Sequence, residues 1–487
     1  MSAPGTADTP DIPDVPVPDV PDVTVIVTLH KAGRDAEPHL HRCLGSLVGQ
    51  TIGEDRIEVF VVDDGTDDGS RAELERFFTD HPRLRTVLLR PGTRNQALAR
   101  ARGRYLFFLR ADGFLGREAL ARLVGAADAY GSGVVYAKTA GATGASGAVF
   151  ARTEHGVPFD APGLPWELSC TKLFRREAAV EPHGLRFHED VPAALAEQAF
   201  TLEALFRGRG ISVLADYDYC FGADPGSEAP AIEDLLRGTA AAMAVTARFT
   251  EPGPLRDGFH LRHFADEADR LTGPGLLEAA EPVRRRVFAG LRRLITDHLS
   301  DAVLARLRPG LRLRLSYVRT GDLPGLLSVI RYEAGHGVPP LRTHLLSANW
   351  RRTGPARHTL VVTARSPLPR LAALDPAPVR LTGTGPQAGR ILLRPAPDGG
   401  GTVIEVRIPA DAFPPGRTRI GLRTSFLGTE HLATVPVGAP PRRAHGLRGL
   451  RPYRLNVAAD GTRGLVVAVS PVGLPGRRLS GGRARPA

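Results

Sequence analysis

Residues 23–130 alternate short apolar segments with segments of helical periodicity, and this alternation constrains the fold more than any other feature of the chain. Segments with apolar residues three or four positions apart, as at Leu40, Leu44 and Leu47, predict helices. The apolar segments have the length and composition of buried strands, and they are VTVIVTL (23–29), IEVFVV (57–62), RTVLL (85–89) and RYLFFL (104–109). Strands that alternate with helices predict an α/β fold with a doubly wound parallel sheet.

The rest of the chain has other patterns. Residues 1–22 alternate Pro and Asp without Lys, Arg or an apolar run, which predicts a disordered leader and neither a signal peptide nor a membrane anchor. The α/β domain is expected to extend over 23–227, and the helical periodicity of 228–337, broken by Pro and Gly, predicts a helical connector. Short alternating segments between Gly/Pro turns predict an antiparallel β-sandwich at 338–475, and 476–487 read as a basic disordered tail.

Charge and cysteine content limit the partners and the compartment. The 487 residues include 63 Lys and Arg against 52 Asp and Glu, a formal net charge of +11. This balance favours polyanionic partners such as phosphate polymers, anionic lipid surfaces or nucleic acid. Of these, a nucleic-acid partner is not predicted for this chain. Cys43, Cys170 and Cys220 lie far apart without a CxxC pair, which argues against a zinc module or a disulfide framework and favours a reducing compartment. No apolar stretch approaches the roughly 20 residues of a spanning helix, so we predict a cytoplasmic protein with peripheral contact at the inner face of the membrane.

Polar residues follow three of the predicted strands at the point where each strand ends. Open parallel sheets bind ligands at the carboxyl ends of their strands, which makes these residues candidates for a site. They are Thr28 to Lys31, the sequence DDGTDDGS (63–70) and Arg110-Ala111-Asp112. Asp64 is placed to accept hydrogen bonds from a nucleobase or ribose, whereas Asp67, Asp68 and Ser70 have the pattern of an acidic turn that caps the next helix.

Six motifs occur together in one order along the chain. They are VTVIVTLHKAG, CLGSLVGQT, IEVFVVDDGTDDGS, TRNQALARARGRYLFFLRADG, TKLFRRE and GLRFHED. In this order and spacing they resemble the family 2 glycosyltransferases with the GT-A fold over residues 23–225, and several motifs in fixed order are stronger evidence than one motif alone. The complete layout is similar to that of the polyribitol-phosphate N-acetylglucosaminyltransferases of wall teichoic acid. The resemblance implies a GT-A domain at 23–227 and an immunoglobulin-like C-terminal sandwich that serves as an oligomerisation module.

The resemblance also implies a pocket for a UDP-sugar donor. Asp64 matches the carboxylate that binds the base, while Thr28 and His30 stand where the first strand borders the nucleotide. Arg94, in TRN, matches an arginine of the donor pocket. YDYCFGADPGS resembles the family's aromatic stretch that ends in a serine and closes over the diphosphate, which makes Ser227 a candidate for that role, although the basic residues often found inside the stretch are missing.

Arg110 and Asp112 occupy the place of the family's DxD motif. Asp112 matches the last acid, which implies a divalent metal, Mn²⁺ or Mg²⁺, on the donor diphosphate, but Arg110 replaces the first acid. One protein carboxylate can suffice for the metal, because the diphosphate and water supply further oxygen ligands. The fixed charge of Arg110 either weakens metal binding through repulsion or helps to hold the diphosphate.

The catalytic base is implied at HED. Asp190 matches the family's base, and Glu189 lies beside it. A carboxylate within hydrogen-bond reach of the acceptor hydroxyl removes its proton, and one base without a covalent intermediate gives inversion at the anomeric carbon. The alternative interpretation of the two acids is the acidic first turn of a helix. Trp166 also has two interpretations, a sugar-stacking platform on the acceptor side or a core residue.

We therefore predict an inverting, metal-dependent glycosyltransferase. It would move an N-acetylhexosamine or hexose from a UDP-sugar to a hydroxyl of an anionic cell-surface glycopolymer, such as a teichoic-acid-type polyol phosphate, or of its lipid-linked precursor. The resemblance implies a homo-oligomer, with a trimer as one expected state. Two alternatives stay open. In the first, the chain is a glycosyltransferase whose acceptor is another exopolysaccharide or a metabolite. In the second, which Arg110 suggests, the chain is a non-catalytic binding or scaffold protein on a degenerate GT-A domain.

Overall fold

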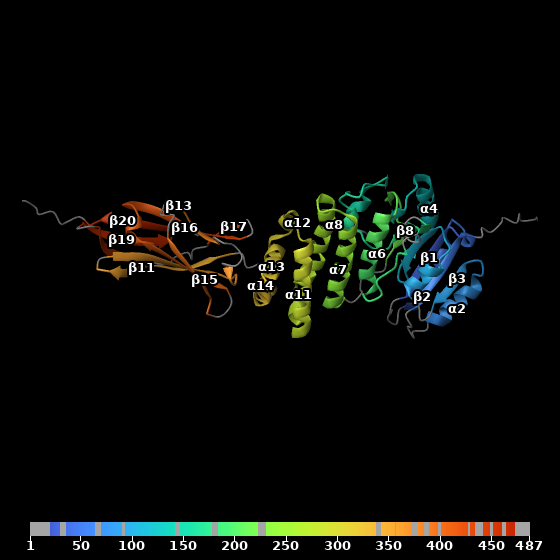
Figure 1. Ribbon diagram of the computed structural model, residues 1–487, viewed down its shortest axis with the longest axis horizontal. Coiled ribbons are helices and arrows are strands. Elements are labelled where there is room, and N and C mark those ends of the chain that lie inside the picture. The colour runs from blue at the N-terminus through green and yellow to red at the C-terminus, as the bar shows by residue number, and fades with distance from the viewer. Residues whose placement is uncertain are drawn as a thin grey trace, which may run out of the picture. The chain divides into compact units, whose positions relative to one another are not determined.

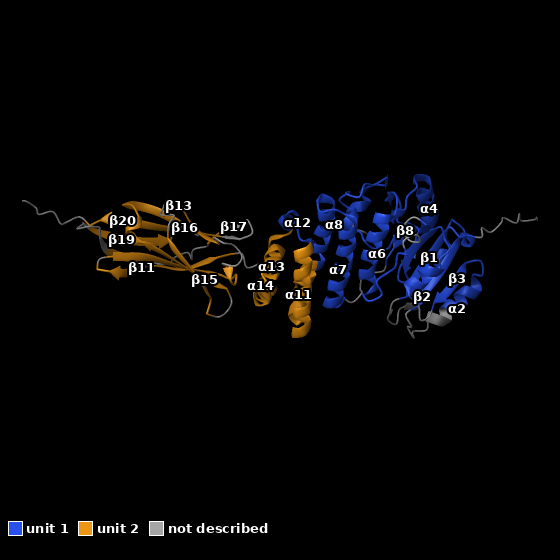
Figure 2. Ribbon diagram, in the orientation of Figure 1, with its two compact units in different colours: residues 1–267, 298–306 blue, residues 268–297, 307–487 orange. Residues whose placement is uncertain are grey.

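The computed structural model divides the chain into two compact units, which are described separately (Figure 1, Figure 2). Unit 1 comprises residues 1–267 and 298–306, and unit 2 comprises 268–297 and 307–487. The structure describes residues 20–29, 36–63, 70–89, 93–141, 147–177, 184–222, 230–337, 342–355, 357–371, 378–383, 389–397, 401–426, 429–433, 442–448, 451–459 and 464–472.

An eight-stranded sheet forms the centre of unit 1. Its order is β3-β2-β1-β4-β8-β6-β9-β7, with the bounds β1 (Val23–Leu29), β2 (Ile57–Asp63), β3 (Arg85–Leu89), β4 (Tyr105–Arg110), β6 (Val134–Ala137), β7 (Glu154–His155), β8 (Lys172–Arg175) and β9 (Ile211–Leu214). The first four strands are parallel, as predicted. β8 runs antiparallel to both β4 and β6, and β7 runs antiparallel to β9. The apolar pattern of a strand carries no direction, so the sequence did not distinguish this mixed half from the parallel half.

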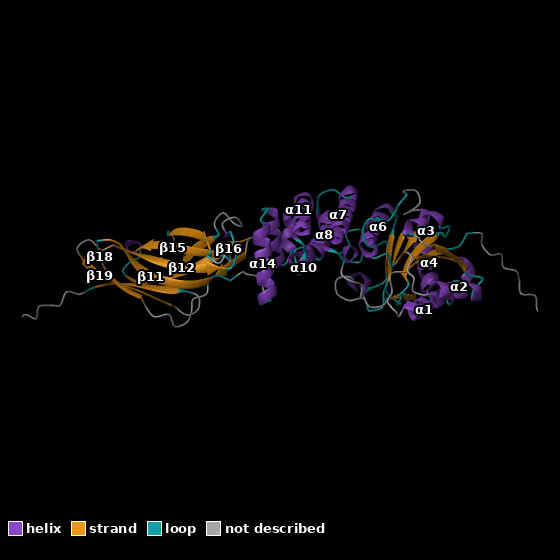
Figure 3. Ribbon diagram, turned by 90° about the horizontal axis from the view of Figure 1, so that it is seen from below, coloured by secondary structure: helices purple, strands orange, loops and turns teal. Residues whose placement is uncertain are grey.

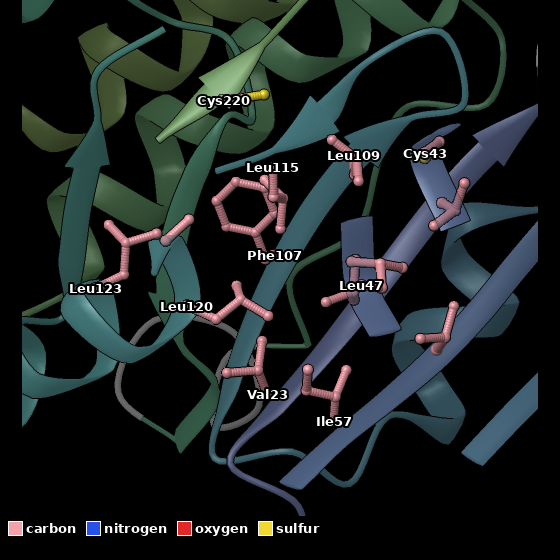
Figure 4. Packing of buried hydrophobic residues seen from close by; sticks show 14 of the residues in the cluster. Val23, Cys43, Leu47, Ile57, Phe107, Leu109, Leu115, Leu120, Leu123 and Cys220 are labelled. Carbon is pink, nitrogen blue, oxygen red and sulfur yellow. The ribbon is translucent and has the colours of Figure 1, made fainter. Parts of the chain in front are cut away.

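Helices cover both faces of this sheet (Figure 3). One face packs against α1 (Ala36–Val48), α2 (Ser70–Asp80) and α4 (Ala119–Tyr130), and the other against α3 (Arg94–Arg100) and α6 (Ala193–Arg207). Successive strand residues point to opposite faces. In β1, Val23, Val25 and Val27 therefore enter the first cluster and Ile26 enters the second. Figure 4 shows the first cluster, in which Val23 and Ile57 lie near Leu47 of α1.

A capping box starts α3, the helix that carries Arg94. Thr93 accepts a hydrogen bond from the Gln96 backbone, and the Gln96 side chain accepts one from the Thr93 backbone, each at 3.3 Å. The sequence signal, Thr followed three residues later by Gln, is present in TRNQ. The start of this helix is thus fixed beside the pocket described below.

The predicted helical region is confirmed, and it contributes to both units. Its helices are α7 (Ile232–Phe249), α8 (Pro254–Ala265), α9 (Glu267–Leu271), α10 (Pro274–Glu278), α11 (Glu281–His298), α12 (Asp301–Arg306), α13 (Pro309–Arg319) and α14 (Leu323–His336). Proline occupies the first turn of α8, α10, α13 and α14, where its missing N–H costs no helical hydrogen bond. In the described parts of the chain, no helix is both long enough and apolar enough to cross a membrane.

Two antiparallel sheets follow in unit 2, as predicted for the C-terminal region. The four-stranded sheet has the order β11 (His344–Gly354), β12 (Arg357–Ser366), β15 (Thr402–Pro409) and β14 (Arg390–Pro395). The six-stranded sheet contains β13 (Val379–Gly383), β16 (Gly416–Phe426), β20 (Leu465–Pro471), β19 (Arg451–Ala459) and β18 (Arg442–Arg448), with β17 (Thr429–Leu432) paired to β16. In β15 alternate residues are buried, from Thr402 to Ile408, so one face of the sheet is core and the other is outward.

Candidate active site

A pocket of about 600 Å³ in unit 1 contains four of the predicted donor residues, Thr28, Arg94, Arg110 and Asp112. The segment from Trp166 to Thr171 forms another part of the pocket wall, and the pocket volume falls in the range of small-molecule sites. Trp166 lines this pocket and is partly buried, so it is available as a wall for a ligand. The remaining lining residues include Glu197, Gln198, Cys220 and Arg262.

Strand register brings the first and third candidate segments together. β1 and β4 are parallel neighbours in which Thr28 is opposite Arg110, and the Ala111 N–H donates to the Thr28 carbonyl at 3.0 Å. The Gly113 N–H donates to the Arg110 carbonyl at 3.0 Å and closes a tight turn around Asp112. The Arg110 loop is therefore held by backbone contacts at the carboxyl end of the sheet.

A short ribbon supports this loop from the other side. β5 (Phe114–Leu115) pairs with β10 (Cys220–Phe221), and the rings of Phe114 and Phe221 stack with centroids 4.6 Å apart. A Cβ at Gly113 would lie 3.1 Å from the Phe221 carbonyl, so a side chain at this position would require the ribbon backbone to shift by a few tenths of an ångström. The ribbon ends beside Asp112, directly before the segment that contains Ser227.

Arg110 and Asp112 form a two-pronged ion pair. Arg110 Nε donates to Asp112 Oδ1 at 2.9 Å, and Arg110 Nη2 donates to Asp112 Oδ2 at 2.5 Å. The hydrogen bond to Asp112 raises the pKa of Arg110 above its ordinary value. The arginine that replaces the first acid of the motif thus engages both oxygens of the acid that remains.

Arg94 is fixed by α6 and by an aromatic ring. Its guanidinium donates to Glu197 Oε1 at 3.3 Å and to the Ala193 carbonyl at 3.2 Å, and it lies 3.8 Å from the centre of the Phe187 ring. Glu197 also accepts a hydrogen bond from the Cys170 N–H at 3.1 Å. Glu197 therefore links the arginine to the wall segment that contains Cys170. Sequence reasoning missed Glu197, although its place on the helix that follows HED was visible.

The predicted catalytic acids lie on an exposed loop that Asn95 anchors. Asn95 Nδ2 donates to the Phe187 carbonyl and to Glu189 Oε1, each at 2.9 Å, and Asn95 Oδ1 accepts from the Phe187 N–H at 2.8 Å. Asp190 is exposed beside Glu189. Neither acid belongs to the described lining of the pocket, but Asn95 joins their loop to the helix of Arg94. Sequence reasoning quoted TRN for Arg94 and missed this role of Asn95.

The buried side chain of Lys172 supports the wall from Trp166 to Thr171 by pairing with Glu167 of that wall. The Lys172 ammonium is fully buried and contacts the Ser169 carbonyl at 2.7 Å, Glu167 Oε1 at 3.3 Å and the Tyr136 ring at 4.3 Å. Burial lowers the pKa of Lys172, and the charge of Glu167 opposes that shift. Burial alone would raise the pKa of Glu167, but the Lys172 ammonium and hydrogen bonds from Ser169 bring it below its ordinary value. Lys172 therefore lies behind the wall and pairs with Glu167 of the wall, a role the sequence did not indicate.

A third arginine reaches the pocket from α8. Arg262 Nη1 donates to Gln198 Oε1 at 3.0 Å and pairs with the buried carboxylate of Glu267. Arg94, Arg110 and Arg262 thus line the pocket together with the carboxylates Asp112, Glu167 and Glu197. Each arginine already has an acidic partner, so an anionic ligand would compete with protein carboxylates for the guanidinium groups.

Three predicted donor residues, His30, Asp64 and Ser227, lie outside the described residues. Asp63, directly before Asp64, is 1% exposed at the end of β2 and is in register with Leu29 of β1.

One side chain of the pocket, Asp112, has the chemistry of a ligand for a divalent cation. The carboxylate of Asp112 is a hard oxygen ligand of the kind that Mg²⁺ and Mn²⁺ prefer. Among the described residues there is no group of three or more His, Cys, Asp or Glu side chains placed to hold a metal. Both Asp112 oxygens accept hydrogen bonds from Arg110, so a cation must displace this arginine and take its other ligands from the donor and water.

Two family matches cover the site and the helices that follow it. Residues 24–182 match Glycosyl transferase family 2, and residues 233–330 match the glycosyl transferase TarS linker domain.

Curated relatives agree with these matches. The chain is 28% identical over 319 residues to a poly(ribitol-phosphate) beta-glucosyltransferase of Bacillus spizizenii, which covers 61% of this chain and 49% of the relative. It is 28% identical over 194 residues to the poly(ribitol-phosphate) beta-N-acetylglucosaminyltransferase TarS of Staphylococcus aureus, covering 38% of this chain and 34% of the relative. The chain thus spans about half or less of the length of these relatives.

Solved structures support the fold. The crystal structure of S. aureus TarS 1–349 in complex with UDP-GlcNAc has a TM-score of 0.55 at 22% identity, covering 67% of this chain and 95% of that chain. The crystal structure of S. aureus TarS has a TM-score of 0.54 at 18% identity and covers 93% of this chain and 86% of that chain. The chain therefore carries a glycosyltransferase family 2 domain of the GT-A type, followed by a linker domain of the TarS type.

Proposed function

We propose that the protein is an inverting glycosyltransferase that moves a hexose or N-acetylhexosamine from a UDP-sugar to a hydroxyl of a polyribitol-phosphate polymer. The observation that carries the proposal is the pocket that joins Thr28, Arg94, Arg110 and Asp112 within a family 2 domain. The names of the relatives support the acceptor, and the UDP-GlcNAc complex of a protein with the same fold supports the donor.

The donor would lie at the carboxyl ends of β1 and β4. Thr28 and Asp64 would contact the nucleotide, with His30 at its border and Ser227 over the diphosphate. Arg94 is fixed against Glu197 and supplies preorganised positive charge where negative charge grows on the departing diphosphate. Arg110 would exchange its partner Asp112 for a phosphate oxygen of the donor.

A divalent cation is part of the proposal. Asp112 would hold Mn²⁺ or Mg²⁺, which when bound neutralises charge on the diphosphate. The ion pair with Arg110 competes with the cation for Asp112. Asp112 would therefore bind the cation when Arg110 pairs with another anion, such as the donor diphosphate.

Asp190 would accept the proton of the acceptor hydroxyl. Glu189 is engaged by Asn95, so its role would be to hold the loop, and the exposed Asp190 carboxylate is the group left to act as general base. One base and one displacement give a product of inverted anomeric configuration. The wall from Trp166 to Thr171 would then face the acceptor side of the pocket.

The remaining proposals concern location and assembly. A protein that works on a polymer precursor would act in the cytoplasm, with peripheral contact at the membrane and the positive net charge of +11 favouring that contact. The C-terminal sheets would form a homo-oligomer, with a trimer as the expected state.

A screen of nucleotide sugars tests the proposal. UDP-glucose, UDP-GlcNAc and GDP-mannose are each incubated with the protein and unglycosylated poly(ribitol phosphate), with Mn²⁺, Mg²⁺ or EDTA, and labelled polymer is counted. We expect label from one UDP-sugar and only when polymer is present. Binding of UDP without transfer from any donor would instead favour a non-catalytic protein. Transfer only to other acceptors would show that poly(ribitol phosphate) is not the acceptor.

A further inference from the structure

The outward face of the four-stranded sheet in unit 2 gathers arginines from three strands. Register places Val361 of β12, Arg407 of β15 and Arg390 of β14 in one row across the sheet. A second row on the same face contains Arg365, Val403 and Arg394. Because Ile404 and Val406 between these rows are buried on the core side, the arginines share the outer side.

A groove of about 710 Å³ lies at one end of this face. It is lined by Arg351, Arg352, Thr353, Thr359, Val361, Gly389, Arg390, Arg407 and Pro409. Val361 points outward with the arginines but is only 5% exposed, so it forms an apolar floor under longer side chains. No carboxylate occurs among the described lining residues. We call this surface the arginine groove.

The charge around the arginine groove is unbalanced within the described strands. The sequences of β11, β12, β14 and β15 contain one acid, Glu405, against the arginines 351, 352, 357, 365, 390, 394 and 407. Glu405 accepts a hydrogen bond from Arg407 Nε at 2.6 Å. That bond, followed by the charges of Arg407, Arg394 and Arg351, lowers the pKa of Glu405. The charges of arginines on three strands therefore act on the single carboxylate of Glu405.

The strand register places two arginines where they repel each other, and a bound anion would relieve this repulsion. Arg390 and Arg407 are directly opposite each other on neighbouring antiparallel strands. Like charges in this position repel and destabilise a sheet. A bound anion between them would convert this repulsion into charge-assisted hydrogen bonds, for which the guanidinium fork is well suited.

We propose that the arginine groove binds successive phosphate groups of the anionic acceptor polymer, which gives the protein a polymer-binding surface outside the catalytic pocket. The identity of the polymer as a polyol phosphate rests on the proposed function. Arg390 and Arg394 are four residues apart on β14, a span of roughly 13 Å at the rise of an extended strand, so the face can contact more than one phosphate.

Other occupants fit the groove less well. A second copy that docks with the same face would bring the arginines together. Single-stranded nucleic acid is usually held by aromatic rings that stack on bases, and the described groove lining contains no aromatic side chain. The lining also offers no large exposed apolar side chain for insertion into a lipid bilayer.

The test compares two double variants of the full chain. Arg351→Gln with Arg390→Gln removes two groove charges and leaves the Arg407–Glu405 pair in place. The matched control, Arg380→Gln with Arg417→Gln, removes two exposed charges from β13 and β16 of the other sheet. Binding of unglycosylated poly(ribitol phosphate) is measured by calorimetry without donor at two salt concentrations. Sugar transfer is measured on long polymer and on a two-unit acceptor.

We expect the groove variant to bind long polymer roughly tenfold more weakly and with a shallower salt dependence, since fewer phosphates are contacted. Its preference for long over two-unit acceptor should fall by a similar factor, whereas the control variant should match the parent protein. Equal binding by groove variant and parent would overturn the inference. It would also be overturned if binding of duplex DNA or of anionic vesicles fell as much as binding of polymer. Absence of transfer to either acceptor by the parent would count against the proposed function, while the binding comparison would still decide on the groove.

Discussion

Replacing Arg110 with Gln should strengthen the binding of Mn²⁺ to the protein when no donor is present. A cation that approaches Asp112 must break the two hydrogen bonds from Arg110 and overcome its charge. Two unit charges about 4 Å apart interact by roughly 1 to 4 kcal/mol between aqueous and near-surface dielectric conditions. The side chains of Arg110 and Asp112 are 42% and 31% exposed, so solvent screening puts the value near the lower end.

We therefore expect about 1–2 kcal/mol, which corresponds to a five- to thirtyfold gain in Mn²⁺ affinity. The assay is the electron paramagnetic resonance signal of free Mn²⁺, titrated with parent protein and with Arg110→Gln in the absence of UDP. Arg42→Gln is the matched control, because Arg42 stacks on Phe114 beside the same loop, 3.6 Å from the ring centre. It should change Mn²⁺ affinity less than twofold. If Arg110→Gln binds Mn²⁺ no more tightly than the parent, the ion pair does not compete with the metal and the reasoning about the altered motif is wrong.

Four further predictions concern catalysis, stability and assembly. Asp190→Asn should lower kcat by 10²- to 10⁴-fold with donor affinity unchanged, and Glu189→Gln should lower kcat less. Equal losses of kcat for the two variants in steady-state assays would contradict the assignment of Asp190 as the base. Lys172→Met leaves the partly buried Glu167 carboxylate without its ammonium partner, so urea unfolding should show a loss of roughly 1–3 kcal/mol, and adding Glu167→Gln should recover part of it. Burial lowers the pKa of His260 to about 4 from the ordinary 6.5. The native state therefore resists protonation, and stability should fall by roughly 1–3 kcal/mol as the pH drops from 6.5 to 4, a loss that His260→Leu should reduce in thermal unfolding. Sedimentation of the full chain should show a trimer, and a monomer at all concentrations would contradict the proposed role of the C-terminal sheets.

Patterns that depend on neighbouring residues in the sequence were sufficient to predict the strands and helices of the parallel half of the sheet. The apolar run at Val23–Leu29 is long enough for one buried strand, and the structure places β1 over the same residues. The helix over Ala119–Tyr130 and the strand over Arg85–Leu89 also follow from local periodicity and composition. The direction of β8 did not follow, because the sequence Lys172–Arg175 has the same pattern in either orientation.

The site was predicted in position but not in its side-chain contacts. Parallel strands end at one edge, so Thr28 and Arg110 were expected to meet, and they lie in register. Whether the Arg110 guanidinium contacts Asp112 or a ligand depends on the side-chain rotamers in a turn. This contact could not be predicted from the residue types. Asn95 binds a loop that is 92 residues away, and such a contact leaves no local periodicity.

The arginine groove shows a different limit of sequence reasoning. Arginines occur throughout this chain, so those of β14 and β15 did not stand out in composition. Only the strand register puts Arg390 opposite Arg407 and leaves Glu405 as the one acid in the four described strands.

The anomeric configuration of the product distinguishes inverting sugar transfer from every alternative considered for this protein. The protein is incubated with an α-linked UDP-sugar and poly(ribitol phosphate), and the new glycosidic linkage is assigned by the proton coupling constant in NMR. We expect a β-linkage on the polymer, because one displacement assisted by Asp190 inverts the configuration of the donor. An α-linkage, or a polymer that gains no sugar from any UDP donor, would contradict it.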